Sequence, residues 1–152
     1  MTFKTILVAL DGSKHAGATA EAAAELARHC EAKLLILHVV APIFDGKVRD
    51  ELGNLARMEH REQTEYEMLQ GFGRDIVHAA ELKARQSGVR QIEALVEVGD
   101  PASLIVDMAR ARGADLIVLG RRGLGPLAGL LLGSVSHKVI QVADRPCLTV
   151  PS

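Results

Sequence analysis

Short apolar runs of strand length alternate along the chain with longer segments of helical pattern. The runs expected to form strands are Phe3–Leu10, Lys33–Val40, Gln91–Val98, Asp115–Leu119 and Cys147–Val150. The segments between them expected to form helices are His15–Cys30, Pro101–Arg112 and Ser134–Val142. A proline at the first position of a helix, as at Pro101, costs no hydrogen bond because its missing N–H would have no partner there.

Most of these strands are apolar on both faces, which is typical of a parallel sheet covered by helices on both sides. Gln91–Val98 instead alternates apolar and polar residues, as a strand nearer an edge does. A length of 152 residues fits one domain. We therefore predict a single doubly wound α/β domain over residues 1–152, with a five-stranded parallel sheet flanked by helices on both faces.

The segment between Pro42 and Gly88 has a less regular pattern. Asp50–Gln70 is rich in Glu, Arg and Met and resembles a helix, but Gly71-Phe72-Gly73 interrupts it before Arg74–Gln86 resumes. Two glycines so close together disfavour a helix interior. We expect a long crossover in two parts, the first of which is mobile or packs separately.

Composition and charge exclude several classes of protein. Hydrophobic residues make up 48% of the chain and charged residues 24%, which is normal for a globular protein and excludes a disordered one. Eighteen Lys and Arg against nineteen Asp and Glu give a net charge of −1, and only 3% of residues are aromatic. The chain thus lacks the basic field and stacking surfaces of a nucleic-acid-binding protein.

The sequence also predicts a cytoplasmic protein without membrane contact. No apolar run approaches the roughly 18 residues of a membrane span. The first ten residues carry a single Lys and pass into Asp11-Gly12-Ser13 with no cleavage site, so we expect no signal peptide. Cys30 and Cys147 form no CxxC pair, and we expect both to be reduced, half-buried thiols.

One candidate site residue follows the first strand. In an open parallel sheet, ligands bind beyond the carboxyl ends of the strands, where the winding reverses. Asp11, which begins the sequence Asp11-Gly12-Ser13, could accept a hydrogen bond from a ligand or help to hold a metal. It could equally be a helix N-cap or a turn residue. Its position alone leaves both interpretations open.

A glycine-rich loop follows the fourth strand. Five glycines fall between Gly120 and Gly133, and glycine lets a backbone present its N–H groups to a phosphate. Ser134 then opens a helix, where its hydroxyl and the free N–H groups of Val135 and Ser136 could hold an anion. The alternative is a flexible loop with an ordinary serine N-cap.

Other nucleotide and metal motifs fit less well. The P-loop pattern GxxxxGK[ST] does not occur, and Gly123–Ala128 matches G-x-G-x-x-A after the fourth strand instead of the first. The six histidines form no HExxH pattern, so zinc is not expected. His38 and His137 could contact a ligand, or be a packed and a surface histidine respectively.

The loop has the spacing Gly120-x2-Gly123-x9-Gly133-Ser134, and with it the chain resembles the nucleotide-binding branch of the universal stress protein family. The resemblance covers almost the whole length. The other segments that carry it are Ile6–Ser13, Leu37–Val39, Gly99–Pro101 and Pro146–Pro151. Together they are much more specific than the glycines alone.

The resemblance implies an adenine nucleotide alpha-hydrolase-like fold that binds ATP or AMP, with Mg²⁺ carried by the nucleotide and within reach of Asp11. It also implies a homodimer formed by the last strand, at Leu148–Val150. The implied site residues are Ala9 and Asp11 on the pocket floor, Val39 meeting adenine through its backbone, Gly120, Arg121 and Gly123 around ribose and phosphates, and Gly133, Ser134, Val135 and Ser136 on the phosphate chain.

Two features of the loop stay open. Neighbouring side chains on a loop usually diverge, so we expect Arg121 to reach a phosphate, as guanidinium groups do well, and Arg122 to be solvated. Leu130-Leu131-Leu132 is expected to anchor the loop on the core, with an exposed docking patch as the alternative.

Three functions remain in view. The first is a stress-response regulatory protein whose bound ATP or AMP changes its shape or its affinity for a protein partner that the sequence does not name. The second is a slow ATPase or nucleotidyl transferase in the same pocket, for which the chain offers Asp11 and Arg121 but no evident base. The third is a nucleotide-free dimeric interaction protein, against which the intact glycine-serine motif argues.

Overall fold

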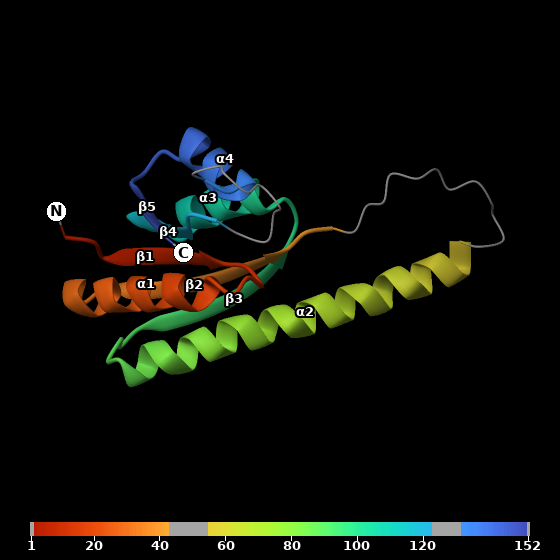
Figure 1. Ribbon diagram of the computed structural model, residues 1–152, viewed down its shortest axis with the longest axis horizontal. Coiled ribbons are helices and arrows are strands. Elements are labelled where there is room, and N and C mark those ends of the chain that lie inside the picture. The colour runs from red at the N-terminus through yellow and green to blue at the C-terminus, as the bar shows by residue number, and fades with distance from the viewer. Residues whose placement is uncertain (1, 43–54, 123–131, 152) are drawn as a thin grey trace.

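A computed structural model of the chain describes residues 2–42, 55–122 and 132–151, with side chains described in the second range from residue 64. The strands are β1 (Thr5–Leu10), β2 (Lys33–Val40), β3 (Ile92–Val98), β4 (Leu116–Gly120) and β5 (Cys147–Val150). The helices are α1 (Ala16–Cys30), α2 (Leu55–Gln86), α3 (Pro101–Ala111) and α4 (Ser134–Val142). Figure 1 shows their arrangement.

The strands form one parallel sheet in the order β3-β2-β1-β4-β5. Helices α1 and α2 cover one face and α3 and α4 the other (Figure 1). This confirms the predicted doubly wound α/β fold. The winding reverses between β1 and β4, so the connections that leave the carboxyl ends of these neighbouring strands lead to opposite faces of the sheet and leave a crevice between them, where such folds bind ligands.

The core follows from strands that are apolar on both faces. Successive strand residues point to opposite faces. Ile6 and Val8 therefore face the layer of α1 and α2, while Leu7 between them faces the layer of α3 and α4. These side chains are fully buried, as are Leu35 and Ile36 of β2. The sheet is thus a rigid support for the loops at its ends.

The predicted interruption at Gly71-Phe72-Gly73 is wrong, because α2 runs unbroken from Leu55 to Gln86. A Cβ on Gly73 would lie 2.7 Å from Cδ2 of His38 and 3.1 Å from Cγ1 of Val96, so glycine lets the helix approach β2 and β3 closely. This packing offsets the roughly 1 kcal/mol by which glycine disfavours a helix relative to alanine. The predicted start at Asp50 lies outside the described residues.

Helix α2 is long, and its first part extends past the end of the sheet (Figure 1). Along the described ranges, no helix combines the length and the apolar character needed to cross a bilayer.

Candidate functional site

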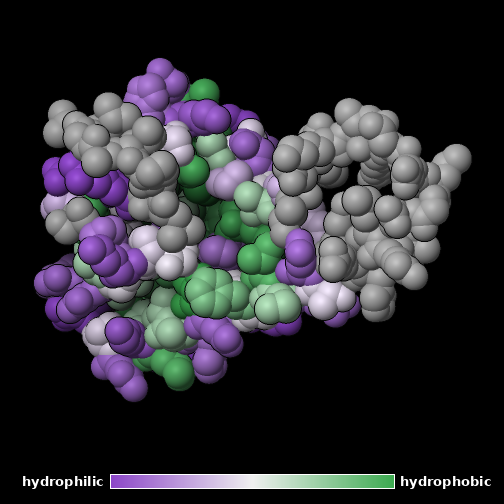
Figure 2. Space-filling view, turned by 45° about the vertical axis from the view of Figure 1, so that its right-hand side comes forward, coloured by the Kyte–Doolittle hydropathy of each residue, from purple (hydrophilic) through white to green (hydrophobic). Residues whose placement is uncertain are grey.

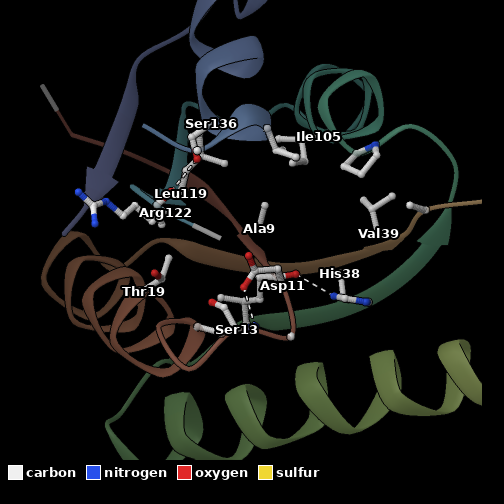
Figure 3. A pocket seen from close by; sticks show the side chains of 18 of the residues that line it. Ala9, Asp11, Ser13, Thr19, His38, Val39, Ile105, Leu119, Arg122 and Ser136 are labelled. Carbon is white, nitrogen blue, oxygen red and sulfur yellow. Dashed lines mark hydrogen bonds between the residues drawn. The ribbon is translucent and has the colours of Figure 1, made fainter. Parts of the chain in front are cut away.

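A cavity of about 480 Å³ opens at the carboxyl ends of β1, β2 and β4. In Figure 2 it is a hollow with a largely hydrophobic floor. Figure 3 shows that its walls come from the sheet, α3, α4 and the start of α1, with α2 passing below. It therefore lies at the point where the winding of the sheet reverses, as predicted for a ligand site.

The loop after β1 is held by its own side chains. Oδ1 of Asp11 accepts a hydrogen bond of 2.9 Å from the N–H of Ser13, and Oγ of Ser13 accepts one of 3.3 Å from the N–H of His15. Asp11 also lines the cavity (Figure 3). The two interpretations of Asp11 are thus compatible, since one carboxylate oxygen shapes the turn while the other is available to a ligand.

The register of β2 directs the backbone of Val39 to the cavity. The N–H of Lys33 donates to Lys4 before β1, whereas the carbonyl of Val40 accepts from Gly99 after β3. The backbone N–H and C=O groups of the odd-numbered residues of β2 are therefore directed toward β1, and those of the even-numbered residues toward β3. Because β1 ends opposite the residue before Val39, the Val39 carbonyl is directed past the end of β1. A planar base placed there would meet a backbone acceptor.

His38 both packs against its neighbours and lines the cavity. Its Nδ1 lies 2.8 Å from the carbonyl oxygen of Leu10, and because a carbonyl only accepts, Nδ1 carries the hydrogen. The ring also lies against the backbone of Gly73. His38 therefore ties the end of β1 to β2 and α2.

The amino end of α4 forms the anion-binding part of the cavity. Gly133 is the N-cap, with φ −68° and ψ 163°, and no side chain caps it among the described residues. The alternative of an ordinary serine N-cap is therefore wrong, because Ser134 is already the first helical residue. The N–H groups of Ser134, Val135 and Ser136 have no intrahelical acceptor, and all three residues line the cavity. Three N–H groups at the positive end of a helix can hold a phosphate.

The hydroxyl of Ser136 has a structural partner. It donates a hydrogen bond of 2.6 Å to the carbonyl oxygen of Gly120, and the residue is only 7% exposed. Since a hydroxyl has a single hydrogen, Ser136 can offer a phosphate only its backbone N–H. Gly120 is enclosed on its other side, where a Cβ would lie 3.1 Å from Oγ1 of Thr19.

Most of the predicted site residues line this one cavity. They are Ala9, Asp11, Val39, Gly120, Gly133, Ser134, Val135 and Ser136. Gly123 lies outside the described residues, as do Leu130 and Leu131, whereas Leu132 lines the cavity.

The two arginines after β4 differ in their relation to the cavity. Arg122 is exposed, as expected, and borders the cavity while its guanidinium points away from the cavity centre (Figure 3). Arg121, which we expected to reach a phosphate, is not among the lining residues. The Nε of Arg121 is buried without a hydrogen-bond partner among the described residues. Of the two arginines, only Arg122 borders the cavity, at its solvent-exposed rim.

Sequence reasoning missed the apolar wall that helices contribute. Leu69 and Phe72 of α2 and Pro101 and Ile105 of α3 line the cavity. Leu69, Phe72 and Ile105 have an ordinary helical spacing, so no local pattern marks them, and Pro101 stood out only as the first residue of its helix. Asp100 fixes the α3 part by accepting hydrogen bonds from the N–H and the hydroxyl of Ser103, at 3.0 and 2.8 Å. These bonds lower the pKa of the Asp100 carboxyl.

Candidate metal ligands are sparse. Among the described residues, no three His, Cys, Asp or Glu side chains lie close enough together to hold an ion.

The comparisons with known proteins agree with this geometry. A universal stress protein from Thermus aquaticus is 37% identical over 150 residues, covering 97% of this chain and 98% of the relative. A solved universal stress protein in complex with cAMP is 28% identical, with a TM-score of 0.70, and the match covers 99% of this chain and 98% of the other. A universal stress protein from Archaeoglobus fulgidus in complex with dAMP is 25% identical, with a TM-score of 0.61 and 98% of each chain covered.

The model of the universal stress protein family matches residues 2–151, nearly the whole chain. The chain therefore belongs to the universal stress protein family.

Proposed function

We propose that the chain binds an adenine nucleotide, ATP or AMP, in this cavity and uses it as a switch of shape or partner affinity in a stress response. The universal stress proteins in complex with cAMP and dAMP support the adenine class. Binding alone suffices for a switch, which needs only that the ligand favours one state over another.

One observation carries the proposal: the free N–H groups at the start of α4 and the backbone of Val39 belong to the same cavity. Figure 3 shows Ser136 and Arg122 toward one end and Val39 toward the other. A phosphate at α4 and a base at Val39 would thus be joined by a ribose near Asp11. The free Asp11 oxygen would accept from a ribose hydroxyl or approach a magnesium ion carried by the nucleotide, since magnesium prefers oxygen ligands.

We also propose that β5 pairs two copies into a homodimer. β5 is an edge of the sheet, and an edge strand presents unpaired backbone groups to another chain. Leu148 is partly exposed on it. Light scattering should then give twice the chain mass, and Leu148→Lys should shift the protein toward monomer.

Mass spectrometry of the nucleotide released on denaturation, followed by ATP titration of the emptied protein, tests the binding proposal. We expect adenine nucleotide to be released, or ATP to bind saturably. Gly133→Val should abolish binding while the protein stays folded by circular dichroism, because the side chain would crowd the N–H groups of α4. A folded wild-type protein that neither carries nor binds adenine nucleotide would refute the proposal.

A further inference from the structure

We propose that Phe72 of α2 stacks on the purine ring of the bound nucleotide and is the main side-chain determinant of base recognition. This inference rests on the proposed function and deepens it. It concerns a residue that neither the glycine-serine motif nor the ends of the strands indicate.

Phe72 is placed over the loop that carries Asp11. It lines the cavity, and a Cβ added to Gly12 would lie 2.9 Å from its Cε1 atom, so the ring is in close contact with the Gly12 backbone. Phe72 is nevertheless 54% exposed. A large aromatic ring that is held on one side and open on the other can gain contact area from a ligand.

The backbone of the next residue fixes where this ring stands. Gly73 lies against His38, whose own ring is tied to the Leu10 carbonyl at 2.8 Å. His38 directly precedes Val39, the residue whose carbonyl is directed past the end of β1. Phe72 is therefore anchored next to the part of the cavity where we place the base, and the anchor is independent of α4.

The wall around Phe72 suits a flat apolar ligand. Leu69, one turn earlier on α2, also lines the cavity, and Pro101 and Ile105 line it from α3. In Figure 3, α2 and α3 lie on opposite sides of the cavity. A planar ring between them would contact apolar side chains on both faces while its edge meets the backbone of β2. Stacking on an aromatic face is available to any base, and a purine offers the larger face.

The aromatic content of the chain makes this position easy to probe. The sequence has three Phe, one Tyr and no Trp. Phe72 is the only one of these aromatic residues among the described residues that line the cavity. Phe72→Trp would thus introduce the only tryptophan of the protein at the proposed stacking site.

The test combines fluorescence with affinity. Emission of F72W should be quenched saturably by ATP and by AMP, with midpoints equal to the dissociation constants from calorimetry, and pyrophosphate should leave it unchanged. Leu82→Trp is the matched control, because Leu82 lies on α2, is 47% exposed and is absent from the cavity lining. Its emission should not respond to ATP.

Phe72→Ala should weaken ATP and AMP binding by the same factor, roughly 5- to 100-fold, since stacking does not depend on the number of phosphates. Phe72→Tyr should retain wild-type affinity, because the ring remains. If Phe72 only supported the fold, F72A would lower the thermal stability of the protein without weakening ATP and AMP binding by the same factor.

The failure of the stacking inference can be distinguished from the failure of the proposed function. If wild-type protein binds ATP but F72A binds it equally well and F72W emission is insensitive to it, the stacking inference is wrong and the proposed function stands. If the folded wild-type protein binds no adenine nucleotide at all, both are wrong.

Discussion

The hydroxyl of Ser136 donates a hydrogen bond of 2.6 Å to the carbonyl oxygen of Gly120, and so joins the first turn of α4 to the last residue of β4. This bond fixes the three free N–H groups of the helix relative to the sheet. A phosphate site made of backbone groups depends on such positioning, because its donors cannot adjust by rotating a side chain. The side chain of Ser136 is thus a positioning group, and only the backbone N–H of this residue is left to a phosphate.

Ser136→Ala should lower the free energy of unfolding by about 1 kcal/mol, because it leaves a part-buried carbonyl without its partner. It should also weaken ATP and AMP binding to a similar extent, through displacement of α4. Urea denaturation and calorimetry measure the two effects. Ser134→Ala is the control, since Ser134 is exposed and should leave stability nearly unchanged. Full stability in S136A would contradict the positioning role.

The two glycines inside α2 should respond to alanine in opposite directions. Gly73→Ala should destabilise the protein by roughly 1–3 kcal/mol, because its Cβ would lie 2.7 Å from Cδ2 of His38. Gly71→Ala should stabilise it by up to about 1 kcal/mol, since the nearest atom, on Arg74, is 3.7 Å from the added Cβ and alanine favours a helix. Thermal denaturation of both variants gives the signs. Equal effects would mean that close packing is not why glycine occupies position 73.

The strands could be predicted from the sequence because their burial is encoded locally. Lys33–Val40 and Cys147–Val150 have the predicted bounds in the structure, since each apolar run ends at polar or turn-forming residues. The continuity of α2 could not be predicted, because the contact that favours Gly73 is with His38 in a distant strand.

The site was predictable to a similar degree. The positions after the strands and at the start of α4 follow from the topology of any open parallel sheet. The choice between Arg121 and Arg122 depends on which way a loop backbone turns, which spacing does not encode. Phe72 reaches the cavity only through the packing of α2 on the sheet, so its helical pattern gave no sign of it.

The cap of α3 should make stability depend on pH. The hydrogen bonds from Ser103 lower the pKa of Asp100, so the ionised form is favoured in the folded state. The stabilisation is therefore present above the ordinary pKa of an aspartate and is lost as the pH falls through the lowered, folded-state value. Asp100→Ala should cost about 1 kcal/mol at pH 7. Its stability should approach that of the wild type in acid.

Denaturation of both proteins at pH 7 and at pH 3 or below checks this dependence. Asp107→Ala is the control, because Asp107 is an exposed residue of the same helix whose ion pair with Arg110 is 3.8 Å long. A pair of that kind contributes little. If the difference between wild type and D100A were independent of pH, the carboxylate would not be the cap.

The arginines after β4 give the last prediction. Arg122 borders the cavity as an exposed side chain and Arg121 does not line it, so Arg122→Ala should weaken ATP binding by only about two- to fivefold, as expected for one exposed charge. The loss should be smaller for AMP, which carries less negative charge, and should diminish as salt screens the attraction. Calorimetry at two salt concentrations measures both trends. Arg121→Ala is the matched control and should retain near-wild-type affinity for ATP. If Arg121→Ala weakened ATP binding and Arg122→Ala did not, Arg121 would be the residue that contacts the phosphates, and the nucleotide would lie elsewhere along the loop.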